Sequence, residues 1–167
     1  MAITELPKII LPNPSLRRQV EQLSGEVISA CYQCGKCTNG CPVTFAMDIV
    51  PHRLMHLISL GYGKETLSSD TIWICVSCET CTTRCPNGID IAHVMDTLRQ
   101  MAQREGITVS QKSVPRFHAE FLSSVRKYGR VHEMGMMLGF ILKGEGPLGL
   151  LKWAGMGISM FLKGKIE

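Results

Sequence analysis

Two runs of four cysteines constrain this chain more than any other feature of its sequence. The first run is CYQCGKCTNGCP at residues 31–42, and CVSCETCTTRCP at residues 75–86 repeats its cysteine spacing and its final proline. Together the runs contain all eight cysteines of the 167-residue chain, so none remains for an unrelated role. The thiols therefore form one set, and the fold must accommodate whatever that set binds.

An even number of cysteines in a small chain also fits a disulfide framework, which is typical of secreted proteins. The N-terminal stretch MAITELPKIILPNPSLRRQ has no basic segment followed by an apolar region, so we expect no signal peptide. We therefore expect a cytoplasmic protein whose thiols stay reduced and bind metal.

The spacing C-x2-C-x2-C-x3-C-P favours iron-sulfur clusters over zinc. Structural zinc usually takes two separate cysteine pairs, whereas three closely spaced thiolates can each reach a different iron of a 4Fe-4S cluster. The same spacing occurs in bacterial ferredoxins, where the fourth cysteine binds the other cluster when two are present. The sequence therefore predicts two 4Fe-4S clusters, with zinc or disulfides as the alternatives.

Carried over to this chain, the ferredoxin pattern divides the cysteines into two crossed sets. The first cluster is assigned Cys31, Cys34, Cys37 and Cys85, and the second Cys75, Cys78, Cys81 and Cys41. Pro42 and Pro86 would turn the chain away after each fourth cysteine, because proline fixes the backbone and removes an amide donor. We expect one-electron transfer and no catalytic residue, since we find no general base, partnered nucleophile or phosphate loop in the sequence.

The formal net charge of +4 would suggest nucleic acid or an anionic membrane as a partner. Two clusters that carry roughly −2 each with their thiolates would cancel that charge, because bound ions enter the electrostatic balance. The sequence also has no basic stripe or helix-turn-helix pattern. We therefore expect no nucleic-acid partner, and a cluster-based sensor or regulator is the less favoured class.

The segments around the runs predict helices. Asp48 is expected to cap a helix that begins near Pro51 and ends at Gly61. After the second run, DIAHVMDTLRQMAQREG predicts a longer helix, with Asp90 as its N-cap and Gly106 as its stop. Its apolar face is expected to contain Ile91, Val94, Met95, Leu98, Met101 and Ala102. These patterns predict an all-α, alpha-helical ferredoxin-like domain over residues 26–107.

A short helix is also predicted in an N-terminal arm, residues 1–25. Asn13 would cap it and Pro14 would occupy its first turn. Its apolar side would consist of Leu16, Val20 and Leu23.

The remaining residues, 108–167, are predicted to form a helical extension. SVPRFHAEFLSSVRKYG predicts a helix that ends at Gly129, and its inward side chains would be Phe117, Phe121, Leu122 and Val125. The segments GMMLGFILKG at 135–144 and GMGISMFLKG at 155–164 then repeat a short apolar pattern. Each is shorter than the roughly 20 apolar residues that cross a bilayer, so we expect no membrane span. We interpret them as a docking arm for another protein of a complex; packing on their own domain and a membrane-surface role are the alternatives.

Several segments together resemble one protein family over nearly the whole chain. CYQCGKCTNGCPV, ICVSCETCTTRCPNGIDI, FLSSVRKYGRVHEMGMM and FLKGK resemble the C subunit of the heterodisulfide reductases of methanogenic archaea. The cluster motifs alone are also similar to the iron-sulfur subunits of succinate dehydrogenase, fumarate reductase and anaerobic glycerol-3-phosphate dehydrogenase. The SVRKYGRV helix and the repeated LKG favour the first family.

The resemblance implies an electron-transfer protein of an oxidoreductase complex, without a substrate site of its own. Its partners in heterodisulfide reductase would be the flavin subunit and the cysteine-rich catalytic subunit, which reduces the CoM-S-S-CoB heterodisulfide in methanogenesis. A hydrogenase or formate dehydrogenase would belong to the larger assembly. The alternative is the iron-sulfur subunit of a quinone-linked or sulfur-metabolism oxidoreductase.

Overall fold

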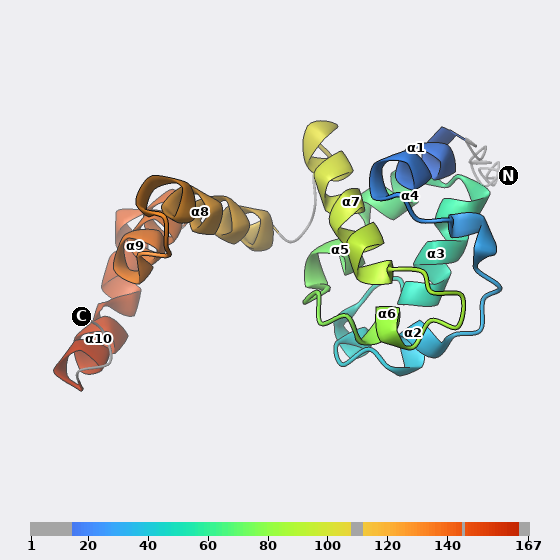
Figure 1. The fold of residues 1–167 in the computed structure, drawn as a ribbon. Coiled ribbons are helices and arrows are strands. Elements are labelled where there is room, and N and C mark those ends of the chain that lie inside the picture. Colours follow the sequence, from blue (N-terminus) through green and yellow to red (C-terminus); the bar gives the residue numbers. More distant parts are fainter. Residues whose placement is uncertain (1–14, 108–111, 145, 164–167) are drawn as a thin grey trace, which may run out of the picture. The chain divides into compact units, whose positions relative to one another are not determined.

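The computed structural model describes residues 15–107, 112–144 and 146–163. The chain divides into two compact units, residues 1–110 and 111–167, and each is described by itself (Figure 1). Within the described residues both units consist of helices joined by loops, without a strand. The predicted all-α fold class is confirmed.

The N-terminal unit contains seven of the described α-helices and two short 3-10 helices. They are α1 (Ser15–Ser24), η1 (Ile28–Ala30), α2 (Lys36–Asn39), η2 (Thr44–Ala46), α3 (Pro51–Leu60), α4 (Gly63–Ser68), α5 (Thr71–Ile74), α6 (Thr80–Thr83) and α7 (Ile91–Arg104). The longest of them, α7, packs against α1, α4, α5 and α6. The one-turn helices α2 and α6 each contain the third cysteine of a run, and they pack against each other (Figure 1).

Apolar side chains of α3 and α7 form the centre of this unit. The fully buried apolar side chains are Val20, Ile28, Leu54, Met55, Ile58, Ile72, Val94, Met95 and Leu98. Burial of one such side chain stabilises a fold by about 1.5–3 kcal/mol. All six residues predicted for the apolar face of α7 are buried, which confirms that prediction.

The predicted end of α3 and start of α7 are confirmed. The carboxylate of Asp90 accepts a hydrogen bond from the amide of His93 at 2.9 Å, so Asp90 is the N-cap of α7. Gly61 ends α3 with a left-handed φ of 84°, a conformation that glycine adopts without a steric cost. Gly106, the predicted stop of α7, also has a left-handed φ, of 63°.

The prediction that Asp48 caps α3 is wrong. Val50 is the N-cap residue of α3 and makes no side-chain capping bond. The carboxylate of Asp48 instead accepts hydrogen bonds from the amide of Thr71 at 3.0 Å and from its hydroxyl at 2.7 Å. Asp48 therefore satisfies free donors at the start of α5, a helix distant in sequence, and this tertiary contact replaces the predicted local one.

The N-terminal helix differs from its prediction in one position. Leu16 and Val20 of α1 are buried, whereas Leu23 is 51% exposed. The predicted cap residues Asn13 and Pro14 lie outside the described residues. Because α1 packs against α3 and α7, its apolar face belongs to the core of the N-terminal unit.

The C-terminal unit contains α8 (Ser113–Tyr128), α9 (Glu133–Gly144) and α10 (Pro147–Leu162). Helix α9 packs against both α8 and α10. Gly129 ends α8 with a left-handed φ of 71°, as predicted. Lys143 donates to the carboxylate of Glu120 at 2.6 Å, which joins α9 to α8. Nearby, a side chain on Gly139 would begin 2.7 Å from a Glu120 oxygen, so glycine permits the close approach of these helices.

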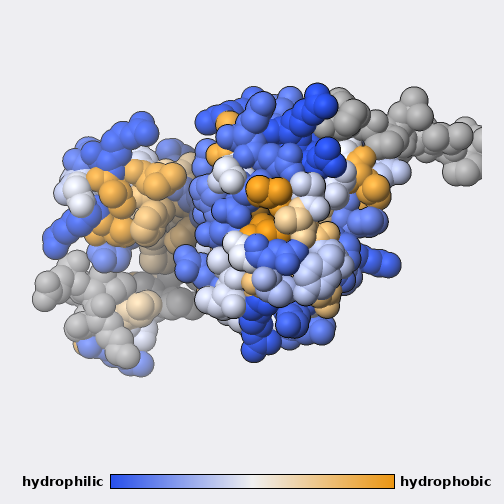
Figure 2. Space-filling view, turned by 45° about the vertical axis from the view of Figure 1, so that its right-hand side comes forward, coloured by the Kyte–Doolittle hydropathy of each residue, from blue (hydrophilic) through white to orange (hydrophobic). Residues whose placement is uncertain are grey.

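The predicted inward face of α8 is wrong for three of its four residues, while the fourth, Val125, is half-buried. Phe117, Phe121 and Leu122 are 42%, 39% and 63% exposed, although the ring of Phe117 meets that of Phe140 edge-on at 5.9 Å. Helix α9 covers only part of the apolar surface of α8, and apolar side chains gather on the visible face of this unit (orange, left, in Figure 2). Among the described helices, none has the length and apolar character to cross a membrane.

Candidate metal centre

The two cysteine runs have the same backbone conformation. Between the first and third cysteine, each loop has two residues with left-handed φ, at matching positions. They are Gln33 (61°) and Gly35 (75°) in the first run, and Ser77 (50°) and Glu79 (58°) in the second. Such left-handed residues curl a short loop, and curled loops present backbone amides to anionic groups, including iron-sulfur clusters.

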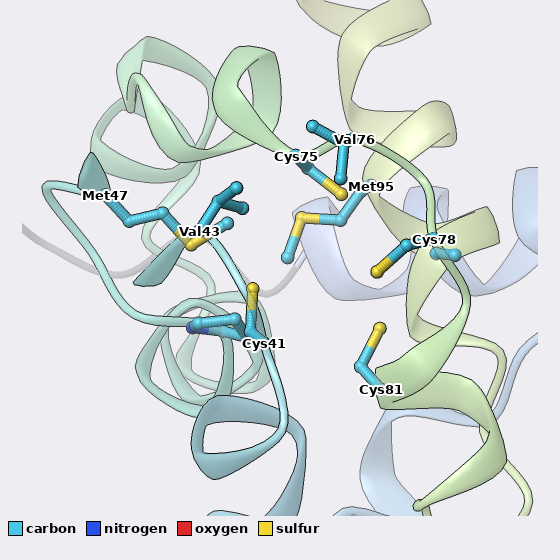
Figure 3. Close-up of a pocket in the computed structure, with 10 residues that line it drawn as sticks. Cys41, Val43, Met47, Cys75, Val76, Cys78, Cys81 and Met95 are labelled. Carbon is cyan, nitrogen blue, oxygen red and sulfur yellow. The ribbon is translucent and has the colours of Figure 1, made fainter. Parts of the chain in front are cut away.

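One pocket of the N-terminal unit contains four cysteines from both runs. Cys41 comes from the first run, and Cys75, Cys78 and Cys81 come from the second. Figure 3 shows their sulfur atoms facing a common space. The remaining lining is apolar: Val43, Met47, Pro51, Val76, Ala92 and Met95. The structure thus brings together the four residues that the sequence assigned to the second cluster.

Electrostatic interactions link the other four cysteines. Burial raises the pKa of the Cys37 thiol, and the nearby thiols of Cys31 and Cys34 raise it further. The pKa of Tyr32 is also raised, first by desolvation and then by the thiols of Cys34 and Cys85. Cys85 of the second run therefore acts on the same tyrosine as Cys34 of the first.

The thiols of the second set differ in how readily they ionise. Burial, with a smaller contribution from Cys75, raises the pKa of Cys81 to about 11. Hydrogen bonding with the hydroxyl and the backbone of Thr80 lowers the pKa of Cys78, and the Cys78 thiol donates to the Thr80 hydroxyl at 3.4 Å. A buried thiolate needs a positive partner, and a metal ion supplies one by displacing the thiol proton. The residues therefore fit a metal-bound group held by sulfur.

The geometry distinguishes between the possible roles of the thiols. All eight cysteines are free thiols, so no disulfide framework is present. Within the described part of the chain, no three Cys, His, Asp or Glu side chains converge as they would on one metal ion. Four sulfurs that come from two separate loops and face one space fit a group with several irons, in which each thiolate can bind a different iron.

Contacts between the runs fix the loops relative to each other. The side-chain amide of Asn87, just after the second run, donates to the carbonyl of Ala30, just before the first. Glu26 accepts a hydrogen bond from the amide of Asp90 at 3.0 Å. A Cβ atom added at Gly40 would lie 2.7 Å from Cδ of Arg84, so glycine permits the close approach of the two runs at this position.

Sequence reasoning missed the polar residues that support the loops. Gln33 donates to the sulfur of Cys31 at 3.3 Å, and Arg99 donates to the carbonyls of Ile72 and Cys75. A signal for Arg99 was present, since it lies four residues after buried Met95 and three before buried Ala102, on the apolar stripe of α7. A charged residue on such a stripe indicates a buried partner.

Comparison with known protein families agrees with this geometry. Residues 27–89, which include both runs and all eight cysteines, match the family described as 4Fe-4S dicluster domain. This segment is a 4Fe-4S dicluster domain. The dicluster domain explains the alpha-helical ferredoxin-like fold, the eight thiols and a role in electron transfer. Among curated proteins, none matches the sequence.

Proposed function

We propose that this chain is the electron-transfer subunit of a CoB-CoM heterodisulfide reductase complex. It would carry electrons from a flavin subunit to the cysteine-rich subunit that reduces the heterodisulfide. The observation that carries the proposal is the combination of a dicluster domain with a separate helical unit whose apolar side chains are exposed. The segments that resemble the C subunit of heterodisulfide reductases support it, because they extend beyond the dicluster domain into α8 and α9.

In this proposal Cys31, Cys34, Cys37 and Cys85 hold one cluster, and Cys75, Cys78, Cys81 and Cys41 hold the other. The 4Fe-4S clusters supply one-electron chemistry when bound. The protein's own residues hold the clusters and adjust their surroundings. Apolar residues such as Val43, Val76 and Met95 line the space around the second set, and Gln33 and Thr80 form hydrogen bonds with sulfurs. Such bonds and burial control the reduction potential.

The C-terminal unit is the proposed docking element. Of its side chains whose burial the structure describes, no large apolar one is buried, and Leu122, Met137 and Leu138 are 63%, 51% and 46% exposed. An apolar surface of this kind is typical of a protein interface. Methionine adapts its shape to irregular surfaces, which suits a helix that packs against another protein.

Anaerobic purification of the tagged, full-length chain from its native cells tests the assignment. We expect a flavoprotein and a second cysteine-rich iron-sulfur protein to co-purify in fixed ratio, and the complex to reduce the CoM-S-S-CoB heterodisulfide. The purified chain alone should contain iron but lack this activity. A complex that contains a quinone-reactive membrane protein, and no heterodisulfide reduction, would contradict the proposal.

The docking role has its own test. Leu122→Glu places a charge on the exposed face of α8, so we expect less of both partner proteins to co-purify while the iron content stays unchanged. Leu23→Glu is the matched control, because Leu23 is similarly exposed but belongs to the N-terminal unit. If Leu122→Glu and Leu23→Glu recover equal amounts of partner, α8 is not the docking surface.

The alternative function is the iron-sulfur subunit of a quinone-linked or sulfur-metabolism oxidoreductase. The cysteine runs favour it as much as the main proposal, because the cluster motifs alone resemble both groups. The composition of the purified complex separates them. A cytoplasmic location is part of both proposals, because reduced thiols need a reducing compartment.

A further inference from the structure

Arg99 is the only buried charged side chain among the residues that the structure describes. It lies on α7 and is 9% exposed. A guanidinium keeps its charge at any ordinary pH, and burying such a charge is costly unless it is paired. Its position therefore needs an explanation beyond apolar packing.

The guanidinium of Arg99 holds the start of the second cysteine run. Its Nε donates to the carbonyl of Ile72 and its Nη2 to the carbonyl of Cys75. Its Nη1 donates to the hydroxyl of Ser77 at 3.2 Å. These acceptors lie before, at and after the first thiol of the run, so one planar side chain orients the loop.

The partner charge of Arg99 faces water. Nη1 also bonds Oδ1 of Asp96 at 2.5 Å, but the Asp96 side chain is 47% exposed, compared with 11% for the Arg99 side chain. Solvent screens the carboxylate more strongly than the buried guanidinium. Asp96 therefore cancels only part of the positive field that Arg99 exerts on the interior.

Among the described residues, the first run has no corresponding buried cation: Arg84, whose guanidinium lies beside Gly40, and Lys36 are both exposed to solvent. Helix α3 follows the first run as α7 follows the second. Arg99 lies eight residues after the start of α7 at Ile91, and the residue eight positions after the start of α3 at Pro51 is the uncharged Ser59. The carbonyl of Ala30, which precedes the first run, accepts instead from the neutral amide of Asn87. Loops with the same backbone conformation thus have different electrostatic surroundings.

We propose that Arg99 makes the two clusters inequivalent by raising the reduction potential of the cluster held by Cys75, Cys78 and Cys81. Reduction adds one electron and hence one negative charge to a cluster, and a nearby buried cation stabilises that charge. Arg99 is a positioning residue, since it acts on the cluster by orienting the cysteine loop and by the electrostatic field of its guanidinium. The inference rests on the two clusters of the proposed function, but not on the identity of the complex.

Redox titration of the full-length protein, monitored by electron paramagnetic resonance, tests this inference. Cys41→Ser and Cys85→Ser first assign the signals, because each alters the cluster to which its residue belongs. In Arg99→Met, the ratio of reduced to oxidised second cluster at a fixed potential should fall by about tenfold, the order expected for one partly screened charge. The first cluster should keep its midpoint potential. Arg99→Lys should restore most of the potential, since it keeps the charge.

A variant of the exposed residue Asp96 provides a second test if the Arg99→Met protein does not fold or bind its clusters. Asp96→Asn removes the exposed partner charge, so the second cluster should become easier to reduce while the first stays unchanged. Arg104→Met is the control, because Arg104 is an exposed cation on the same helix. Equal shifts of both clusters, no shift in Asp96→Asn, or an Arg99→Lys protein that behaves like Arg99→Met would overturn the inference. A wild-type protein without two cluster signals would instead refute the proposed clusters themselves.

Discussion

The two cysteine runs share a spacing and a backbone conformation but differ in what surrounds them. Gly35 and Glu79 occupy matching left-handed positions, and Gly40 and Arg84 occupy matching positions at the end of α2 and α6. The second loop is held by a buried arginine, while a neutral amide contacts the start of the first. The shared spacing therefore produces two similar cysteine loops. The different residues around these loops would give the two bound clusters different reduction potentials.

The largest expected effect comes from removing one crossed cysteine at a time. Cys85→Ser should disrupt the cluster of Cys31, Cys34 and Cys37, even though Cys85 lies in the second run. Cys41→Ser should disrupt the cluster of the second run. Iron content and electron paramagnetic resonance of each purified variant measure the loss, which we expect to reach about four irons when one 4Fe-4S cluster is lost.

The opposite pattern would refute the crossed assignment. If Cys85→Ser removes the signal that Cys78→Ser also removes, each run binds its own cluster. The two single variants and the Cys78→Ser reference are therefore compared in the same preparation.

A smaller effect, on the stability of the fold, is expected from replacing Asp48, which hydrogen-bonds to the segment before the second run. The carboxylate accepts from the Ser69 hydroxyl at 2.8 Å and from the amides of Asp70 and Thr71 at 3.1 and 3.0 Å. Asp48→Ala should destabilise the fold by about 2 kcal/mol, because it leaves donors of α5 without a partner. The midpoint of unfolding in urea measures this loss, and faster amide exchange in residues 69–74 locates it. Glu105→Gln, which removes an exposed carboxylate elsewhere, is the control.

The pH dependence of that effect has a definite sign. Partial burial raises the pKa of Asp48, but hydrogen bonds from Thr71, Ser69 and the amide of Asp70 outweigh it and hold the pKa below its usual value. The carboxylate therefore stabilises the fold above about pH 4, and this contribution is lost as the pH falls through the lowered pKa. The carboxylate stays ionised at roughly pH 6 to 8, so the difference in unfolding free energy between wild type and Asp48→Asn should be constant over this range. A difference that grows with pH in this range would contradict the account.

The smallest expected effect concerns the paired left-handed residues. Gly35→Ala should cost about 1 kcal/mol, because no neighbour lies close enough to clash and only the left-handed backbone resists the change. Glu79→Gly should stabilise the second loop by about 0.5–1 kcal/mol, because it relieves the same strain. Glu79→Gln is the control, since it removes the charge and keeps the strain. Urea midpoints that move in the same direction for Gly35→Ala and Glu79→Gly would contradict this comparison.

Local patterns in the sequence predicted α1, α3 and α7 of the N-terminal unit, but not its short helices α2, α4, α5 and α6. Asp90 and Gly61 act through their own backbone neighbours, so their roles follow from local sequence, and the same holds for Gly129 in the C-terminal unit. The contacts of Asp48 and Arg99 span 23 and 27 residues, and no local pattern specifies such partners. The cysteine spacing indicated which thiols could share a site, whereas the residues that hydrogen-bond to the loops emerged only from the fold.

The C-terminal unit was predicted less well for a physical reason. The apolar spacing of Phe117, Phe121 and Leu122 indicates a face that avoids water, but not what covers it. In the structure these side chains stay largely exposed within their own unit. A face of this kind has the same sequence pattern whether its partner is in the same chain or in another one.

The content of metal and acid-labile sulfide per chain tests the central claim most directly. After anaerobic purification, the full-length protein should contain about eight irons and eight sulfides, as two 4Fe-4S clusters require. About four irons per chain would mean that the two runs form a single cluster. One zinc ion per run, without sulfide, would contradict the electron-transfer account altogether.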